Sequence, residues 1–386
     1  MLKIVIIFAL MLFTCFSFSK ENNHDHSIAT SFTIDKKGYL WRTYEKNGFL
    51  IVDYSKNFGI NFSDPVSVNT IFQKIGTTGD ARPKIVTNSK GNIFLTWTEN
   101  LKKPYTGYIW FSSSINRGKS FSKPFIIHKD KNEITHRFDS LLIDKNDHIF
   151  VAWIDKRDMM LAKKANKNYF GASIYFSQSK DNGLSFSTEK KVTDNSCECC
   201  RISFTELKNN KLVLLWRHVY PGNIRDHAIS FIDNNSITQS KQVTFSNWKV
   251  DACPHQGPAL ISDNDENLHI SWFDGGKNLG LYYQKLNSKG DALLSPIKIG
   301  NYLSISDHST LISVNKYLYI AWREINQESQ KINVMISNDN GTTWDQPKIL
   351  YVDQNTIDHP SLVNFNNNVY VGFNTRYNGF KLFKLK

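Results

Sequence analysis

The sequence of 386 residues has little of what marks fibrous, membrane-spanning and nucleic-acid-binding proteins. Only 10 prolines and 20 glycines are spread along it, which excludes a collagen-like chain. The one long apolar run stands at the extreme N-terminus, which excludes a polytopic membrane protein. The net charge is +12, but lysine and arginine form no cluster and no basic helix, so we expect no nucleic-acid partner.

The composition is that of a chain that folds around hydrophobic cores. Apolar residues make up 40% of it, aromatic residues 13% and charged residues 21%, which is too much apolar surface for a disordered protein. The dispersed positive charge favours solubility and a general attraction to anionic partners, among them acidic glycans.

The N-terminal segment has the anatomy of an export signal. A lysine supplies the positive start, residues 4–13 are almost purely apolar, and Ser17 and Ser19 place small residues where a signal peptidase inspects the chain. We therefore expect residues 1–19 to be a signal peptide. Residues 20–386 then form a single mature domain that is exported, either periplasmic or secreted.

Two other outcomes stay open for this segment. Leu12-Phe13-Thr14-Cys15 is a loose lipoprotein box, which would place a lipid anchor on Cys15. An uncleaved membrane anchor is the second alternative. After processing, no membrane span is expected in the rest of the chain.

A turn followed by a short strand recurs seven times. In each case a turn rich in Asn, Asp, Lys and Gly leads into alternating apolar residues that end on an aromatic. The closing aromatics lie 50 to 63 residues apart. The segments are Gly38 to Tyr44, Gly91 to Trp97, Asp147 to Trp153, Asn210 to Trp216, Glu266 to Trp272, Lys316 to Trp322 and Asn367 to Phe373.

Each unit divides into four strands with period-2 alternation and turn signals between them. In the second unit we expect strands at 83–87, 92–97, 108–113 and 124–128. Such four-stranded antiparallel units predict an all-β fold, a β-propeller in which each blade packs on its neighbours; a solenoid of β-hairpins is the rival. The last unit stops after its third strand, so six or seven blades are possible, with closure by a strand from the N-terminal region.

A second repeat stands at the turn after the third strand of four units. It fits Ser-x-[Asp/Asn]-x-Gly-x-x-[Phe/Trp], in which Asp or Asn bonds its own backbone, Gly accepts a positive φ and the aromatic packs under the loop. The chain here resembles the Asp-box, or BNR-repeat, family of sialidase-like β-propellers over essentially its whole mature length. The four boxes span Ser55 to Phe62, Ser114 to Phe121, Ser179 to Phe186 and Ser337 to Trp344, with a remnant at Asn287 to Gly290.

Residues at the starts of the innermost strands converge in a propeller, because these strands line one axis. Six successive units place cationic, imidazole or thiol groups there, which predicts a funnel for an anionic ligand; the alternative is a wet channel with a polar lining. The residues are Arg82, His136, Arg137, Cys199, Cys200, Arg201, Cys253, His255, Asp307, His308, Asp358 and His359.

The loops after the closing aromatics add acids beside bases on the same face. Such pairs bind an anion and move protons, and they are equally typical of a solvated rim full of salt bridges. They are Glu99, Asp155, Arg157, Asp158, Arg217, His218, Asp274, Arg323, Glu324, Arg376 and Tyr377.

The cysteines allow two interpretations. Exported chains are oxidised as a rule, so the four thiols of Cys197, Cys199, Cys200 and Cys253 predict two disulfides in one of three connectivities; a strained link between adjacent Cys199 and Cys200 is a further form. Alternatively these thiols and His255 form a soft-metal site for copper(I) or zinc. No cofactor is certain from the sequence.

The family resemblance implies a retaining exo-glycosidase. Three arginines clamp the carboxylate of the sugar, a tyrosine assisted by glutamate attacks the anomeric carbon, and an aspartate shuttles the proton. Placement alone gives the roles in this chain: Arg82, Arg137 and Arg201 as the clamp with His308 and His359 as further substrate ligands, Asp155 as acid/base, and Tyr377 backed by Glu324 as nucleophile.

The motif transfer is incomplete. Enzymes of this family usually open with Arg-Ile-Pro, whereas this chain has Arg82-Pro83 in its second unit, and its cysteine segments are foreign to the family pattern. Three hypotheses follow: a candidate glycoside hydrolase that acts on or binds an acidic glycan or another small anion, an exported copper or zinc protein, and a non-catalytic binding scaffold.

Overall fold

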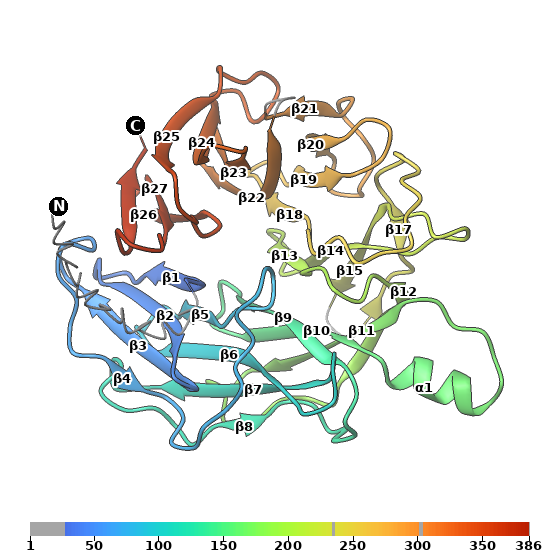
Figure 1. Cartoon of the computed structure of the whole chain (residues 1–386), viewed down its shortest axis with the longest axis horizontal. Coiled ribbons are helices and arrows are strands. Elements are labelled where there is room, and N and C mark those ends of the chain that lie inside the picture. The colour runs from blue at the N-terminus through green and yellow to red at the C-terminus, as the bar shows by residue number, and fades with distance from the viewer. Residues whose placement is uncertain (1–27, 234–235, 301–303, 386) are drawn as a thin grey trace, which may run out of the picture.

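The computed structural model describes residues 28–233, 236–300 and 304–385, and it shows a seven-bladed β-propeller (Figure 1). Seven small antiparallel sheets surround one axis, and the strands of each blade follow one another in sequence order. The expected fold class is therefore confirmed, and the number of blades equals the seven repeats in the sequence. The predicted signal peptide at residues 1–19 and the predicted lipid site at Cys15 lie outside the described residues.

The first four blades are each built from consecutive strands. Blade 1 contains β1 (Thr30–Ile34), β2 (Leu40–Lys46), β3 (Phe49–Ser55) and β4 (Val66–Ser67). Blade 2 contains β5 (Lys84–Thr87), β6 (Ile93–Asn100), β7 (Gly107–Ser114) and β8 (Phe125–Ile126), in agreement with the predicted strands. Blade 3 contains β9 (His136–Ile143), β10 (Ile149–Asp155), β11 (Ala172–Ser179) and β12 (Lys190–Ser196). Blade 4 contains β13 (Ser203–Glu206), β14 (Leu212–Arg217), β15 (His227–Asp233), β16 (Ser236–Ile237) and β17 (Lys241–Gln242), the last two both pairing with β15.

The last three blades complete the ring. Blade 5 contains β18 (Ala259–Ser262), β19 (Leu268–Asp274), β20 (Gly280–Leu286) and β21 (Ile297–Ile299). Blade 6 contains β22 (Ile305–Val314), β23 (Tyr317–Ile325), β24 (Gln330–Ser337) and β25 (Lys348–Asp353). Blade 7 contains β26 (Ser361–Phe365), β27 (Asn368–Phe373) and β28 (Lys381–Lys384).

The ring closes where blade 7 meets blade 1. The inner strand β26 contacts β1, but within the described residues the seventh sheet keeps three strands and shares none with the first. Side chains make the junction instead: the Thr30 N–H donates to the Asp358 carboxylate at 3.0 Å, and Phe32 meets Phe380 edge to face at 5.2 Å. The expected borrowing of an N-terminal strand is thus not seen among these residues.

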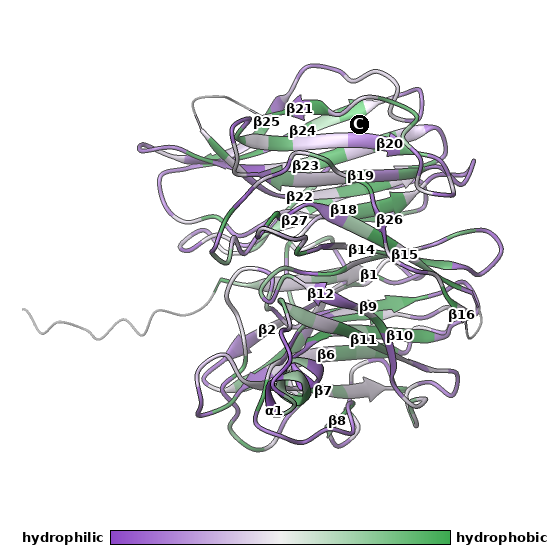
Figure 2. Cartoon of the chain, turned by 90° about the vertical axis from the view of Figure 1, so that its right-hand side faces the viewer, coloured by the Kyte–Doolittle hydropathy of each residue, from purple (hydrophilic) through white to green (hydrophobic). Residues whose placement is uncertain are grey.

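In most blades the second strand is buried on both faces because neighbouring blades cover it. β10 and β14 are buried along their whole length, and the closing aromatics Trp97, Trp153 and Trp322 are fully buried. Apolar stretches lie on the strands, whereas hydrophilic residues gather in the connecting loops (Figure 2). Burial on two faces explains why these strands are continuous apolar runs in the sequence.

The four box turns share one hydrogen-bond pattern. In blade 3 the Gly183 N–H donates to Ser179 Oγ at 2.9 Å, and the Ser185 N–H donates to Asp181 Oδ1 at 3.0 Å. The same two bonds recur at Ser55, Ser114 and Ser337 within 0.1 Å of these lengths. The side chains of serine and of aspartate or asparagine therefore replace water as partners of the turn backbone.

Two inner strands carry bulges near their first residues. In β9 the register shifts opposite Ala152 and Ile154, and in β22 it shifts between Asp307 and Thr310. Phe138 and His308, inside these bulges, have φ values of 55° and 47°. A positive φ is uncommon for a residue with a side chain, and bulges of this kind are typical of functional sites.

One helix interrupts the pattern. Helix α1 (Arg157–Lys164) lies between β10 and β11, protrudes from the ring and buries none of its residues (Figure 1). The sequence predicted a loop here, because the segment is too short to show a helical period. Within the described residues, no helix has the length and apolar character needed to cross a bilayer.

Candidate functional site: the axial cavity

A cavity of about 340 Å³ opens on the propeller axis, and side chains from several blades form its wall. Its ionisable groups come from residues far apart in the sequence, because each inner strand brings its own first residues to the axis. They are Arg82, His255, His308, Arg323, Asp358 and His359.

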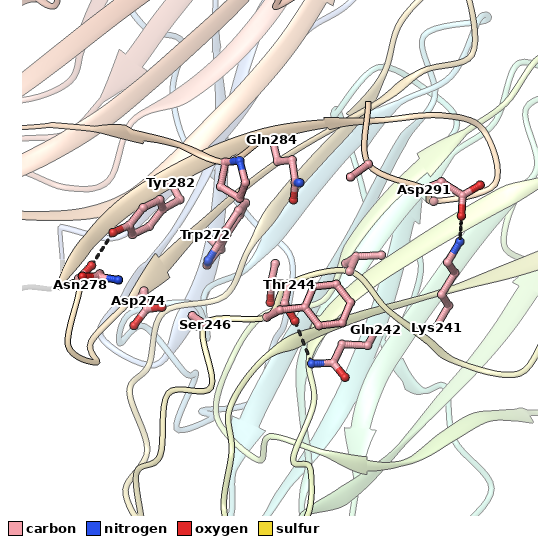
Figure 3. Close-up of a pocket in the computed structure, with 15 residues that line it drawn as sticks. Lys241, Gln242, Thr244, Ser246, Trp272, Asp274, Asn278, Tyr282, Gln284 and Asp291 are labelled. Carbon is pink, nitrogen blue, oxygen red and sulfur yellow. Dashed lines mark hydrogen bonds and ion pairs between the residues drawn. The ribbon is translucent and has the colours of Figure 1, made fainter. Parts of the chain in front are cut away.

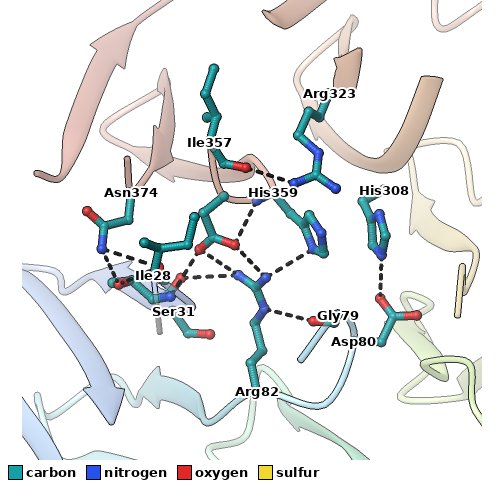
Figure 4. Close-up of polar contacts among 12 residues, drawn as sticks. Ile28, Ser31, Gly79, Asp80, Arg82, His308, Arg323, Ile357, His359 and Asn374 are labelled. Carbon is teal, nitrogen blue, oxygen red and sulfur yellow. Dashed lines mark hydrogen bonds and ion pairs between the residues drawn. The ribbon is translucent and has the colours of Figure 1, made fainter. Parts of the chain in front are cut away.

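Arg82 is the centre of this cavity (Figure 4). Its guanidinium donates to both oxygens of Asp358, at 2.6 and 3.0 Å, and its Nη2 lies 3.0 Å from His359 Nδ1. Because guanidinium can only donate, His359 Nδ1 accepts, and the proton of this imidazole is therefore on Nε2. Burial, followed by the neighbouring His308 and Arg82, holds the pKa of His359 well below its usual range, so the ring is neutral.

His308 lies directly against His359 and faces two carboxylates. Its Nδ1 is 3.1 Å from Asp307 Oδ2 and its Nε2 is 3.7 Å from Asp80 Oδ1. Although burial alone would raise it, His308 and Arg323 lower the pKa of Asp307 to about 2. Ligand atoms of Asp307, His308 and His359 lie within 4.8 Å of one another, so these three residues are able to hold a metal ion.

Below this cavity a second one, of about 240 Å³, continues along the axis and shares Arg82 and His359. Arg201 lies in its wall, donating to Asp80 Oδ1 at 3.3 Å and to the Ser309 carbonyl at 2.6 Å. Lys84 also lies in its wall, and burial lowers the pKa of Lys84 to about 8. The axis therefore carries a column of basic groups, each close to an acid or a carbonyl.

Among the predicted clamp residues, Arg82 and Arg201 reach the axis and Arg137 does not line either cavity. Arg137 lies over the ring of Phe138 at 4.9 Å, near Cys199 and Cys253. Arg323 takes the third place in the upper cavity, and two of its nitrogens bind Asp307 at 2.7 and 3.0 Å. The arginines of the axis are thus Arg82, Arg201 and Arg323.

The predicted acid/base Asp155 lies within blade 3. Its carboxylate accepts from Trp153 Nε1 at 2.9 Å and from Arg157 at 2.6 Å, and it is 3.7 Å from His136 Nε2. It is completely buried, and so is His136. This network joins strand β10 to helix α1.

The predicted nucleophile pair is not assembled in the cavity wall. Glu324 accepts from Trp322 Nε1 at 3.0 Å, on the side of β23 opposite Arg323. Tyr377 is 72% exposed and does not line the axial cavity. The roles given to Asp155, Glu324 and Tyr377 stay predictions from placement.

The cysteines form a compact thiol cluster beside the axis. Cys197 Sγ is 3.7 Å from both Cys199 Sγ and Cys200 Sγ, and all three side chains are buried. These sulfurs are too far apart for disulfide bonds of about 2.05 Å. Cys253 is exposed and in thiol hydrogen-bond contact with Cys199, whereas His255 lines the axial cavity. The predicted five-residue metal set is therefore divided between two places.

Asp80 also belongs to this site, although the sequence did not indicate it as a site residue. It accepts from the backbone N–H groups of Arg201 and Gly257 at 3.1 and 2.8 Å, so it joins blades 4 and 5 to the second blade. Burial opposes its ionisation, but Arg201 and His308 hold its pKa below the usual range. The one available signal was its position two residues before Arg82.

The fold and the cavity define a class, a seven-bladed propeller with a charged axial site. No protein-family model matches the sequence, and neither does any curated protein. Solved structures share the fold. An ulvan lyase of a polysaccharide lyase family matches with a TM-score of 0.56 at 11% identity, over 91% of this chain and 90% of its own. A Hadza microbial sialidase matches with a TM-score of 0.50 at 12% identity, over 88% and 74%.

A third structure, an α-L-arabinofuranosidase from Fusarium graminearum, matches with a TM-score of 0.51 at 10% identity, over 80% of this chain and 92% of its own. All three are named for action on glycans, and at these identities the likeness is one of fold. The chain is therefore similar in architecture to glycan-processing propellers.

Proposed function

We propose that this protein is exported and binds an acidic glycan in the axial cavity, as a candidate glycoside hydrolase. The observation that carries this proposal is the convergence of Arg82, His308, His359 and Arg323 on one cavity. Its two guanidinium groups are paired with the carboxylates of Asp358 and Asp307, so an acidic ligand would bind by taking the place of one of these carboxylates. Guanidinium binds a sugar carboxylate through two parallel hydrogen bonds.

Proton transfer is assigned to the imidazoles. His359 is neutral with its proton on Nε2, whereas His308, stacked on it, faces Asp307 and Asp80. As an imidazolium, His308 can give its proton to the leaving oxygen while a water molecule attacks the anomeric carbon and one of these carboxylates takes the proton of that water. The retaining chemistry with Tyr377 and Glu324 is not needed for this proposal. Binding of an acidic glycan without turnover would instead support the scaffold hypothesis.

The test measures binding and cleavage of acidic oligosaccharides. The probes are sialyllactose and an ulvan oligosaccharide that contains no unsaturated uronate. We expect Arg82→Met to weaken binding of the preferred probe by at least about tenfold. Arg42→Met is the matched control, because Arg42 binds Asp53 with two nitrogens at 2.6 and 2.9 Å but lies in blade 1 away from the axis. Equal affinity of wild type and Arg82→Met would refute the axial site.

A specific observation favours a second function, the binding of a soft metal ion. The three sulfurs of Cys197, Cys199 and Cys200 are buried with their ligand atoms within 4.8 Å of one another. Hydrogen bonds from the other two thiols lower the pKa of Cys197 and so favour its thiolate. Thiolates in this number suit copper(I) or zinc.

Anaerobic titration of the fully reduced protein with copper(I) or zinc, against a competing chelator, tests the thiol cluster. We expect one ion per chain and its loss in Cys200→Ser. Cys253→Ser shows whether the exposed thiol is a fourth ligand. Isolation of the native protein with two disulfides, or no uptake of either ion, would end this candidate. The same intact mass reports cleavage after Ser19 and any lipid on Cys15, and so tests export.

A further inference from the structure

Another cavity lies away from the axis, between blades 4 and 5. It measures about 540 Å³, and its walls come from the segment that begins at β17, from the strands β19 and β20 and from the loop after β20 (Figure 3). No residue of the axial cavity belongs to it. The groups that decide its chemistry are Phe245, Trp272, Asp274, Tyr282 and Gln284.

The cavity exists where a box turn has lost its aromatic residue. In blades 3 and 6 the box aromatics fill the space next to the preceding blade: Phe186 meets Phe111 and Trp344 meets Tyr283, each pair at 4.9 Å. In blade 5 the turn keeps its glycine, Gly290. The third residue after this glycine, where the other boxes have their aromatic, is Leu293, which is half exposed. The space beside this turn therefore stays open.

Two buried polar atoms in the wall have no hydrogen-bond partner. Six blades carry a tryptophan in the second strand, and in five of them the indole N–H is bonded, for example Trp153 to Asp155 and Trp322 to Glu324. Trp272 Nε1 is the exception, although its side chain is 4% exposed. Gln284, 6% exposed, gives its Nε2 to the Leu294 carbonyl but leaves Oε1 unpaired.

These atoms face the cavity, since both side chains lie in its wall and point toward the segment that carries Thr244 (Figure 3). A buried donor or acceptor without a partner destabilises the fold. The wall therefore offers one donor and one acceptor to a guest that brings a hydroxyl group.

The remaining wall suits an uncharged guest with an apolar face. The Trp272 and Tyr282 rings are stacked, with centroids 5.6 Å apart, and Phe245 is 70% exposed at the cavity. Lys241 and Asp291 neutralise each other at the rim, which leaves Asp274 as the unbalanced charge and disfavours an anion. A sugar ring has an apolar face for aromatic contact and hydroxyls for the amide and indole groups.

We propose that this cavity is a second binding site, for a neutral saccharide unit. It is independent of the proposed axial function, because it is built from different residues and selects the opposite charge class. In a polysaccharide with both neutral and acidic units, the two sites would hold different parts of one chain.

The experiment is calorimetric titration of the full chain with four neutral disaccharides: lactose, cellobiose, xylobiose and arabinobiose. We expect at least one to bind with a millimolar Kd. Phe245→Ala should weaken that binding by about tenfold, because it removes the exposed aromatic contact. Trp272→Phe should weaken it by about fivefold, because it removes the indole donor and keeps a ring.

Phe72→Ala is the matched control, since Phe72 is 67% exposed at blade 1 and should leave the affinity unchanged. Phe245→Ala removes only an exposed side chain, so it remains informative if Trp272→Phe does not fold. Arg82→Met should also leave disaccharide binding unchanged, which separates this site from the axial one. Two outcomes would overturn the proposal. One is that no disaccharide binds at about 10 mM, the concentration at which a weak, millimolar affinity would show. The other is that indole binds with the same dependence on Phe245, which would make the cavity a general apolar site.

Discussion

The imidazole rings of His308 and His359 are stacked in the axial cavity, with centroids 3.4 Å apart and planes 15° from parallel. Two imidazolium ions at this separation would repel each other, so the pair carries at most one positive charge. Arg82 next to His359 adds a further cation and keeps that ring neutral. The bulge in β22 makes the stack possible, because it turns His308 away from the regular strand direction.

Replacement of one ring tests the proton-transfer role. For the proposed hydrolysis of an acidic glycan, His308→Gln should lower kcat by about a hundredfold, because glutamine cannot exchange a proton with a leaving oxygen. KM should change little, since the arginines that bind the carboxylate remain. Steady-state kinetics measure both values. His148→Gln, in the turn between β9 and β10 and bonded to Asp144, is the control, and an unaltered kcat in His308→Gln would remove the imidazole pair from the reaction.

The Arg82 and Asp358 pair should be worth more to stability than its exposed counterparts. Both side chains are almost fully buried, so Arg82→Met leaves an uncompensated carboxylate and should cost about 3 kcal/mol in the free energy of unfolding. The double variant Arg82→Met with Asp358→Asn should recover part of this loss. Urea denaturation of the three variants gives the coupling energy. Equal stability of the single and double variants would contradict a buried charge effect.

The box turns depend on glycine for two reasons that can be separated. Gly183 has a φ of +81°, and an added Cβ would lie 2.4 Å from the Phe111 ring. Gly222, in the loop between β14 and β15 and outside the boxes, has a φ of +79° but open space where the Cβ would be. Gly222→Ala should therefore cost about 1 kcal/mol from backbone strain alone, and Gly183→Ala about 2 kcal/mol more from the clash. Thermal unfolding of both variants measures the difference, and similar Tm values would show that the contact relaxes freely.

Stability below pH 4 should depend on Asp263. Although burial alone would raise it, hydrogen bonds from His269 and Asn267 lower the pKa of Asp263 to about 2. The unfolded chain then binds the proton first, so the contribution of Asp263 is complete above about pH 4 and is lost as the pH falls toward 2. We expect Asp263→Asn to remove on the order of 2 kcal/mol of this pH-dependent stability.

Urea midpoints of the wild type and of Asp263→Asn, taken between pH 4.5 and 2.5, make this comparison. Asp265→Asn is the control, because Asp265 is exposed in the same turn. Parallel curves for the wild type and Asp263→Asn would show that other carboxylates dominate in this range.

The repeats made the architecture predictable. Each blade encodes its own turn, strand and closing aromatic within about fifty residues, so local sequence reports local structure and the number of units gives the number of blades. Even the identity of several axial residues followed, since Arg82, Arg201, His308 and His359 occupy equivalent starts of inner strands. Local information is sufficient where structure repeats.

The pairing of those residues could not be predicted in the same way. Arg201 binds Asp80 from 121 positions earlier, and Arg82 binds Asp358 from 276 positions later, so the contacts depend on closure of the ring. Arg137 is displaced toward the thiols by a bulge that no sequence pattern announced. Loss of the box aromatic at Leu293 was visible in the sequence, but the cavity it leaves depends on how two blades pack.

The junction between the first and last blades has a thermodynamic consequence. The carboxylate of Asp358 accepts hydrogen bonds from Thr30 in blade 1 and from Arg82 at the start of blade 2, and it thereby connects the two ends of the propeller. An acidic ligand that binds Arg82 must therefore weaken the contact between Arg82 and Asp358. The affinity for the axial ligand and the stability of the contact between the first and last blades are therefore linked. A change in one alters the other by the same coupling free energy. The axial ligand and the closure of the ring compete for the guanidinium of Arg82.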